Sequence, residues 1–419
     1  MARRFLRLST SLAYARGGYS VALSLGSEGD SVNVLLDTGS SSLAVTKERY
    51  KPQRDSLLSP TPYAQRINYG KGRLAGPVLR THVGVGDRDE RRGVDAVALT
   101  YVEGEVPYFF RDADGILGLA YRHLNTAYDL TTLLEADGHN PALTWPWPYA
   151  ELDASAQAEF FEQLRQQPRL ALQPLFSALE AHDIFADVFA LTVRRSVAHV
   201  LDEDASTEQL HGNPLNRGTL VLGGGEECQD LYDGAFADLR VVDDIYYNVN
   251  LLSVQVGDQD PIPAPKLEEK YTAGSASNAI IDTGSSFVML EGTVYDAVIA
   301  AFGVHDPRLP ELVTQFNDAF ANNRGLPNSA IRFADWPVLR LRFEAPDGSE
   351  TCLRCDPSNY WQHNGFYARQ SVFLLLRQVP GWPNQSVLGL PLMADCYVVF
   401  DRSNGEHGRV RFARAQTQD

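Results

Sequence analysis

The most constraining feature of this sequence is a pentapeptide, Asp-Thr-Gly-Ser-Ser, that occurs twice. It begins at Asp37 and again at Asp282, and each copy follows an apolar run. A second pair of similar segments follows in the same order, Ile116–Ala120 after the first copy and Val387–Pro391 after the second. Because the two copies are separated by a long stretch of unrelated sequence, the pattern indicates a duplicated domain and not an array of short repeats.

Most of the chain is expected to form short strands, since runs of β-branched and aromatic residues alternate with Gly, Pro, Asn and Asp. The expected strands include Tyr19–Leu25, Val32–Leu36, Val83–Gly86, Val94–Thr100, Leu220–Leu222, Val249–Val256 and Val338–Phe343. Helical spacing is clearest between Ala154 and Ala181, where Pro168 and Pro174 should divide it into several short helices. For 419 residues, this predicts a mainly β protein of two related lobes, residues 12–195 and 196–419.

The composition argues against two classes of partner. The chain carries 37 Lys and Arg against 53 Asp and Glu, a net charge of -16, which repels nucleic acid and anionic membranes. No stretch approaches the roughly 18 uninterrupted apolar residues that a membrane span needs. We therefore expect neither nucleic acid nor a membrane as a partner.

Cysteine is scarce, with single residues at positions 228, 352, 355 and 396, so disulfides cannot be the main source of stability. The Cys352–Cys355 spacing is that of a metal knuckle or a redox motif, but no second Cys/His pair lies close by, and we expect no metal. Disulfide pairing among the four cysteines is left open by the sequence. Charged and polar residues interrupt the N-terminal apolar run, so no signal peptide is recognised and a cytoplasmic location is expected.

The repeated motif suggests a specific chemistry. A strand that ends in Asp-Thr-Gly delivers a carboxylate at a tight turn, and glycine lets a second backbone come close. If the two turns meet, Asp37 and Asp282 cannot both ionise, and the pair holds one proton over the acidic range. The ionised carboxylate then takes a proton from a water, while the protonated one hydrogen-bonds the carbonyl of a peptide bond. The attack needs no covalent intermediate.

Three residues of each motif are expected to support this catalytic dyad. They are Gly39 and Gly284, which let the backbone turn, Thr38 and Thr283, which are placed to hydrogen-bond across the turns, and Ser40 and Ser285, which are placed to hold the outer carboxylate oxygens.

The motifs resemble those of the pepsin-like aspartic peptidases, in which two carboxylates share one proton. The matching segments follow the family order and are Leu36–Ser41, Tyr69–Gly72, Asp114–Tyr121, Leu222–Gly224, Ile281–Ser285, Leu388–Gly389 and Tyr397–Arg402. The resemblance implies a bilobal fold of two related β lobes with a central cleft, and an aspartic endopeptidase with an acidic optimum. It also implies a monomer without cofactor, extended polypeptide substrates with hydrophobic residues at the scissile bond, and binding of statine-type inhibitors.

The resemblance also places residues of the substrate site. Tyr69 corresponds to the tyrosine of a hairpin flap that closes over the dyad, with Gly70, Lys71 and Gly72 at its tip. The hydrophobic wall before the scissile bond corresponds to Phe109 and Phe110, and Tyr246 corresponds to a residue on the other side of the cleft.

Several features depart from the family pattern. Ala44 stands where pepsins usually have a tryptophan that hydrogen-bonds the flap tyrosine, and the β-secretase branch also has alanine there. Lys71 puts a cation in the flap tip. The small disulfide loop and the inhibitory prosegment are not recognised, and residues 122–173 form an inserted helical segment in the N-terminal lobe. These features resemble the prokaryotic pepsin homologues known as shewasins. A catalytically silent peptide-binding protein on the same fold is the alternative, although such a protein would be expected to lack one of the aspartates.

Overall fold

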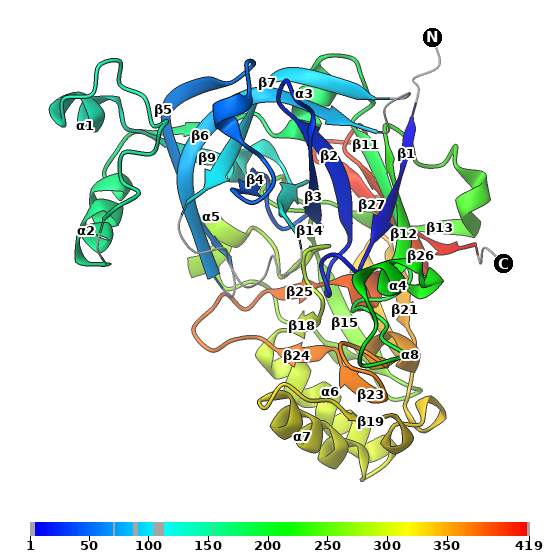
Figure 1. Cartoon of the computed structure of the whole chain (residues 1–419). Coiled ribbons are helices and arrows are strands. Elements are labelled where there is room, and N and C mark those ends of the chain that lie inside the picture. The colour runs from blue at the N-terminus through cyan, green and yellow to red at the C-terminus, as the bar shows by residue number, and fades with distance from the viewer. Residues whose placement is uncertain (1–4, 70–71, 87–90, 104–112, 153, 417–419) are drawn as a thin grey trace. The chain divides into compact units, whose positions relative to one another are not determined.

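The computed structural model describes residues 5–69, 72–86, 91–103, 113–152 and 154–416. The chain divides into two compact units (Figure 1). The N-terminal unit is Ser20–Phe185, and the C-terminal unit combines Met1–Tyr19 with Ala186–Asp419. These units are defined by contacts, whereas the expected lobes, 12–195 and 196–419, are defined by the duplication and stay a prediction.

The N-terminal unit consists mainly of strands. They are β2 (Ser20–Leu25), β3 (Asp30–Asp37), β4 (Leu43–Thr46), β5 (Ser59–Tyr69), β6 (Gly72–Val85), β7 (Arg92–Val102), β8 (Gly115–Gly118), β9 (Thr126–Asp129) and β10 (Arg169–Ala171). The strand order is β10-β9-β5-β6-β7-β4-β8-β3-β2, and a further pairing of β6 with β2 closes six of these strands into a ring. The interior of the ring is apolar, because Val32, Val34, Leu79 and Val83 are all fully buried.

The predicted insertion contributes the helices α1 (Thr131–Ala136) and α2 (Ala154–Arg165), and α3 (Leu175–Ala181) follows it. The prediction that prolines divide the helical stretch is confirmed, since Pro168 and Pro174 lie between α2 and α3, where a proline would interrupt a helix. Both inserted helices pack against the N-terminal unit. Leu134 of α1 and Phe160 of α2 pack on Ala64, so the insertion covers the middle of β5.

The C-terminal unit has four sheets. Its strands are β1 (Leu6–Ser11), β11 (Val188–Val193), β12 (Arg217–Leu222), β13 (Tyr232–Arg240), β14 (Asn248–Val249), β15 (Leu251–Val256), β16 (Ile262–Pro263), β17 (Ala279–Ile281), β18 (Val288–Leu290), β19 (Leu326–Pro327), β20 (Leu339–Glu344), β21 (Glu350–Cys355), β22 (Trp361–His363), β23 (Gln370–Phe373), β24 (Leu375–Arg377), β25 (Ser386–Leu388), β26 (Cys396–Asp401) and β27 (Arg409–Ala415). The orders are β1-β12-β11-β26-β27-β13, β14-β17-β25-β18-β24, β16-β15-β20-β21 and β19-β23-β22.

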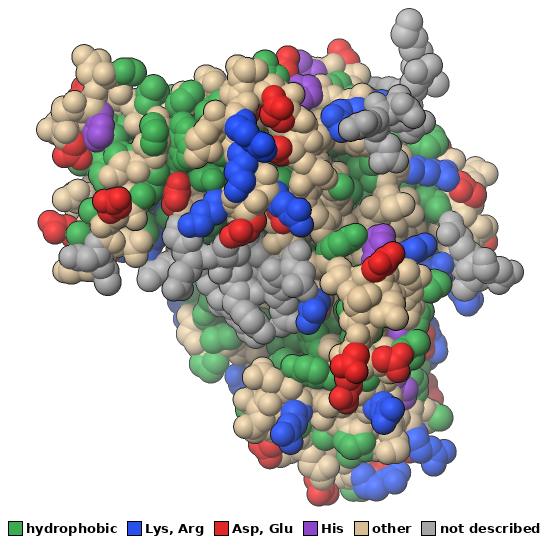
Figure 2. All heavy atoms as spheres, viewed as in Figure 1, with side chains coloured by type: hydrophobic (Ala, Val, Ile, Leu, Met, Phe, Trp, Pro, Cys, Tyr) green, Lys and Arg blue, Asp and Glu red, His purple; other side chains and the backbone are tan. Residues whose placement is uncertain are grey.

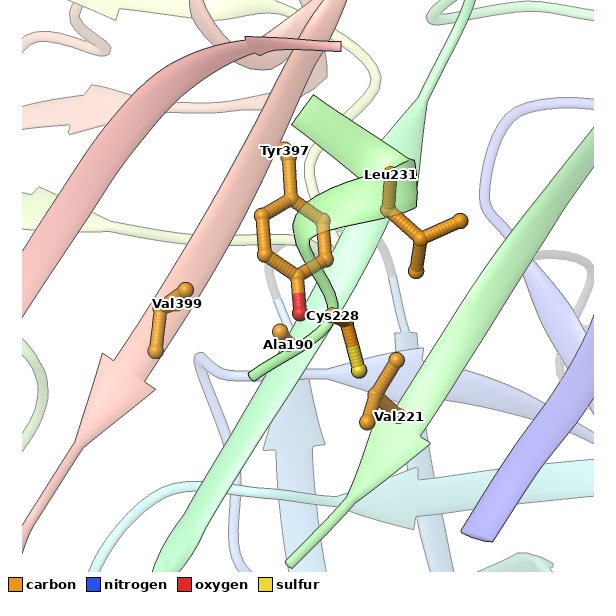
Figure 3. Packing of buried hydrophobic residues seen from close by; sticks show 6 residues of the cluster. All are labelled: Ala190, Val221, Cys228, Leu231, Tyr397 and Val399. Carbon is orange, nitrogen blue, oxygen red and sulfur yellow. The ribbon is translucent and has the colours of Figure 1, made fainter. Parts of the chain in front are cut away.

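One core of this unit lies on the sheet that contains β11, β12 and β26 (Figure 3). The side chains of Cys228 and Tyr397 are fully buried there against Ala190, Val221 and Val399. The Tyr397 hydroxyl donates to the carbonyl oxygen of Gly225 at 2.8 Å, so the polar end of this buried ring is satisfied. Cys228 therefore packs here as a small apolar residue.

The helices of the C-terminal unit lie outside the stretch for which the sequence analysis expected helices, Ala154–Ala181. They are α4 (Thr207–Gly212), α5 (Thr272–Ser275), α6 (Gly292–His305), α7 (Leu309–Phe320), α8 (Pro357–Tyr360) and α9 (Leu390–Met393). The two longest, α6 and α7, lie in a region for which the sequence analysis predicted no helix. Helix α6 begins at a capping residue, Glu291, whose carboxylate accepts from the backbone N–H groups of Thr293 and Val294.

Most of the expected strands are confirmed with small shifts of their ends, but Val83–Gly86 is only the C-terminal end of β6, which begins at Gly72. The predicted strand Val249–Val256 is divided at Asn250 into β14 and β15, which belong to different sheets. On the face of the molecule in Figure 2, acidic and basic side chains of the described residues lie interspersed.

Candidate functional site

The first candidate aspartate, Asp37, is the last residue of β3 and is only 5% exposed. Both carboxylate oxygens are held by the turn that follows. The backbone N–H of Gly39 donates to Oδ1 at 2.8 Å, and the Ser40 hydroxyl donates to Oδ2. Ser40 therefore contacts the Asp37 carboxylate, and its role at the outer oxygen of a dyad stays a prediction.

The segment that follows the first motif, Ile116–Ala120, which is called its downstream echo below, supports this turn directly. Strand β8 runs parallel to β3 with Gly118 opposite Asp37, and the N–H of Leu119 donates to the Asp37 carbonyl at 2.7 Å. Only glycine fits at position 118, because a Cβ atom there would lie 2.5 Å from the backbone of Ser41. The repeated apolar-Leu-Gly segment thus belongs to the same local structure as the aspartate.

The second candidate aspartate, Asp282, follows β17 and is built in a similar way. Its backbone N–H donates to the Leu388 carbonyl at 3.1 Å, and the N–H of Gly284 donates to Oδ1 at 2.8 Å. Strand β25 runs parallel to β17, and the residue that follows β25 is Gly389. A Cβ atom on Gly389 would lie 2.3 Å from the carbonyl oxygens of Ser285 and Phe287.

The two turns differ in the acceptor of the serine hydroxyl and in the exposure of the aspartate. Ser40 donates to the carboxylate of Asp37, whereas Ser285 donates to the carbonyl oxygen of Phe287 at 2.9 Å. Asp37 is buried and Asp282 is half-buried. The threonines behave alike, since Thr38 and Thr283 are at most 2% exposed. Each turn therefore holds a carboxylate in a fixed orientation at the end of a buried strand, which is the geometry that a general acid or base requires.

The predicted flap corresponds to a hairpin of β5 and β6 in which Tyr69 pairs with Gly72 across the turn. The tip residues Gly70 and Lys71 lie outside the described part of the chain, as do Phe109 and Phe110.

Tyr246 lies in the turn that precedes β14, and its backbone N–H donates to the side-chain oxygen of Asn248 at 2.9 Å. The next residue, Tyr247, accepts from the backbone N–H of Ile281 at 3.1 Å. Tyr246 therefore lies one residue from a direct partner of the strand that carries Asp282.

Comparisons with known proteins match both halves of the chain. A family model described as eukaryotic aspartyl protease matches residues 18–136, and one described as xylanase inhibitor C-terminal matches residues 246–414. A β-secretase of Strongylocentrotus purpuratus is 21% identical over 419 residues, which covers 95% of this chain and 66% of that protein. Pepsin II-2/3 of Oryctolagus cuniculus is 28% identical over 125 residues, 27% of this chain and 32% of that protein. The chain thus spans less than two thirds of the length of these relatives.

The eukaryotic aspartyl protease model and the β-secretase and pepsin relatives together support the pepsin-like aspartic peptidase family for this chain. The first matched range contains Asp37 and the β5–β6 hairpin, and the second contains Tyr246 and Asp282. The mainly β fold agrees with this family.

In this pepsin-like chain, sequence reasoning missed a buried polar cluster beside the first turn. Ala44, at the usual tryptophan position, is fully buried in β4, and nearby lie the buried side chains of Gln65 and Asn125. The Gln65 side-chain amide donates to the side-chain oxygen of Asn125 at 2.9 Å. The sequence carried no clear signal for this cluster, because the burial of Gln65, which makes its amide need internal partners, is set by the tertiary structure.

The cysteines and the cavities do not point to a second centre. All four cysteines are free, and Cys352 is exposed while Cys355 is buried, because residues three apart in β21 face opposite sides of the strand. Within the described ranges, no group of three or more His, Cys, Asp or Glu side chains is arranged to hold a metal ion. A cavity of about 310 Å³ in the N-terminal unit is lined by Arg80, Arg122 and His182 among others, and by neither motif. None of the helices in the described part of the chain has the length and apolar character that a membrane span needs.

Proposed function

We propose that this chain is an aspartic endopeptidase in which Asp37 and Asp282 form the catalytic dyad. The observation that carries the proposal is the local equivalence of the two turns. In each, a backbone N–H two residues further on holds the carboxylate at 2.8 Å, and a glycine of the downstream echo lies against the turn. The N–H two residues on is common to other acidic turns, such as that of Asp347, but the close packing of Gly118 and Gly389 against the turns is shared by the two motifs.

The proposed reaction follows from two carboxylates that share one proton. The ionised carboxylate removes a proton from a water molecule, and the protonated carboxyl group donates a hydrogen bond to the carbonyl of the scissile peptide bond. After the water attacks, the dyad returns a proton to the leaving amine. Because one proton must stay on the pair, activity should be greatest at acidic pH and fall when both carboxylates ionise.

The proposed substrate is an extended polypeptide with hydrophobic residues at the scissile bond, covered by a flap that carries Tyr69. Statine-type transition-state mimics are expected to bind. At a concentration 100 times its Kd, such an inhibitor should stabilise the folded protein by about 2.7 kcal/mol. The monomeric state and the cytoplasmic location stay predictions from the sequence.

The test is to replace each aspartate by asparagine and to measure cleavage of a diverse peptide pool between acidic and neutral pH. Asp37→Asn and Asp282→Asn should each abolish turnover, because neither amide can accept a proton from water. The matched control is Asp347→Asn. Asp347 is an exposed aspartate outside the motifs that accepts from a backbone N–H two residues on, that of Ser349, at 2.9 Å. Turnover by either dyad variant at the wild-type rate would remove the dyad from the mechanism.

A second candidate function is peptide or protein binding without catalysis. It is favoured by one observation, the match of residues 246–414 to the xylanase inhibitor C-terminal model. The intact Asp282 turn opposes it. A wild-type protein that binds statine-type inhibitors but cleaves no peptide in the pool would establish this alternative, and clear turnover would exclude it.

A further inference from the structure

The flap strand β5 carries a side chain that ordinary strand packing does not explain. Gln65 lies four residues before Tyr69 and is only 2% exposed. Its amide nitrogen donates to the side-chain oxygen of Asn125 at 2.9 Å and to the carbonyl oxygen of Thr126 at 3.1 Å, with the Ser42 hydroxyl 3.3 Å away. Its amide oxygen accepts from the Thr100 hydroxyl. Every hydrogen-bonding atom of this amide therefore has a partner.

These partners connect Gln65 to the first Asp-Thr-Gly turn. Ser42 follows the motif directly, its carbonyl accepts from the N–H of Gly118 at 3.0 Å, and its hydroxyl donates to the side-chain oxygen of Asn125 at 2.8 Å. Asn125 is 2% exposed and Ser42 is 3% exposed. The cluster of Gln65, Ser42, Thr100 and Asn125 thus joins the flap strand, the segment after the turn, β7 and the start of the insertion.

The cluster lies beside the position where the usual tryptophan is missing. Ala44 pairs with Thr100 in the parallel ladder of β4 and β7, and the hydroxyl of Thr100 donates to Gln65. An alanine side chain offers no hydrogen bond, so support for the flap must come from elsewhere. A fully satisfied buried network fixes its members strongly, because each broken bond leaves a buried polar group without water.

We propose that Gln65 is the positioning residue of the flap, and that through Asn125, Ser42 and Thr100 it fixes the β5–β6 hairpin against the first catalytic turn. The inference rests on the proposed function, since it assigns a role in substrate binding. Gln65 does not touch substrate. It sets the fraction of molecules whose hairpin is held in the binding-competent position.

The consequence for kinetics is specific. If only a fraction of molecules has an ordered hairpin, the apparent affinity for substrate and for inhibitor falls by that fraction, while saturating substrate restores the competent state. Loss of the Gln65 amide should therefore raise KM and the Ki of a statine-type inhibitor by a similar factor and leave kcat nearly unchanged. Damage to the dyad would lower kcat instead.

The experiment compares three variants of the full chain. Gln65→Met keeps the side-chain length and removes the amide, and Thr100→Val removes a single donor to it. The control, Asn216→Leu, removes a buried amide of the C-terminal unit that donates to the carbonyl oxygens of His199 at 3.0 Å and Leu210 at 2.8 Å. Stability, KM, kcat and inhibitor Ki are measured for each, together with amide hydrogen exchange of residues 59–69 and 72–85.

For Gln65→Met we expect KM, Ki and the exchange rate of the hairpin to rise roughly ten- to a hundred-fold, since loss of the amide leaves its buried hydrogen-bond partners unsatisfied. Thr100→Val should shift the same quantities in the same direction by a smaller factor, and it keeps the proposal testable if Gln65→Met does not fold. Asn216→Leu should lower stability without these shifts.

Two outcomes would overturn the proposal. One is that Gln65→Met and Thr100→Val lose stability like the control while KM, Ki and hairpin exchange stay at wild-type values, which would make the cluster merely structural. The other is a fall in kcat with unchanged KM. Failure of the proposed function is distinguishable, because a wild-type protein that cleaves nothing and binds no inhibitor would still report the hairpin through exchange.

Discussion

Replacing Gly118 by alanine should destabilise the N-terminal unit by about 1–6 kcal/mol, a substantial part of the roughly 5–15 kcal/mol that holds a typical domain together. The added Cβ atom would lie 2.5 Å from the N, Cα and C atoms of Ser41, a separation at which one backbone must move. Neither backbone is free to do so, because the N–H of Gly118 donates to the Ser42 carbonyl at 3.0 Å and that of Leu119 to the Asp37 carbonyl at 2.7 Å.

The magnitude combines three effects. Overpacking against a rigid neighbour costs about 1–3 kcal/mol. The two stretched backbone hydrogen bonds cost about 0.5–1.5 kcal/mol each. The smaller conformational freedom of alanine in the unfolded chain offsets about 0.4–1 kcal/mol of this. Because the same movement displaces Asp37, the folded variant should also lose on the order of a hundred-fold in kcat/KM.

The assay is urea unfolding of Gly118→Ala, followed by circular dichroism at constant pH, with peptide cleavage measured below the transition. Gly389→Ala should behave similarly, since its Cβ atom would lie 2.3 Å from the carbonyl oxygens of Ser285 and Phe287. Gly274→Ala is the control, because nothing lies within 4 Å of its added Cβ atom. If Gly118→Ala were as stable and as active as Gly274→Ala, the downstream echo would not support the catalytic turn.

Three further predictions concern other parts of the molecule. Burial raises the pKa of Asp55, but hydrogen bonds from Thr81, Tyr50, Ser27 and Leu57 outweigh burial and leave it below its usual value. The stability lost in Asp55→Asn should therefore be largest above about pH 4 and shrink as the pH falls through the folded-state pKa; equal losses in urea unfolding at pH 6 and pH 3 would contradict this. A thiol reagent should label exposed Cys352 in the native protein and buried Cys355 only after unfolding, as mass spectrometry would show. Phe160→Ala should cost about 3–5 kcal/mol in urea unfolding, because Phe160 is buried between the insertion and β5; a cost below 1 kcal/mol would mean that the insertion does not pack there.

The sequence predicted the parts of the fold in which local pattern and tertiary structure agree. The two motifs and their downstream echoes were recognised as pairs, and the structure gives the reason: Gly118 and Gly389 each lie against the turn that carries an aspartate. Prolines also gave reliable boundaries, since Pro168 and Pro174 act through backbone geometry and need no partner elsewhere.

Helix α6 is an element that the sequence pattern does not identify clearly. Helix α6 has buried residues Val294, Val298 and Phe302, but apolar residues also fill much of its remaining surface, so the pattern of a half-buried helix is weak. Its start is marked by a glutamate whose side chain accepts from backbone N–H groups, a cap outside the usual Ser, Thr, Asp and Asn. Neither the spacing of the apolar residues nor the capping residue therefore identified α6 clearly.

The Gln65 cluster could not be predicted for a different reason. Its members come from four separate segments, and each alone is an ordinary polar residue in a strand or a loop. Only the register of β5 against its neighbours brings the amide to Asn125 and Thr100. A buried amide needs hydrogen-bond partners, but both its burial and its partners are set by the tertiary structure.

The structure shows how the insertion is attached to the rest of the N-terminal unit, which its sequence did not indicate. Strand β9 enters it and β10 leaves it; the two strands pair with each other, and β9 also pairs with β5. At their base the N–H of Leu172 donates to the Asn125 carbonyl at 2.7 Å, while the Asn125 side chain accepts from Gln65. The ends of the inserted segment are therefore closed on the residue that helps to fix the flap strand, and its helices pack on Ala64, the neighbour of Gln65. An insertion anchored in this way adds apolar cover to β5, while the segment from β3 to β4 that carries Asp37 lies outside it.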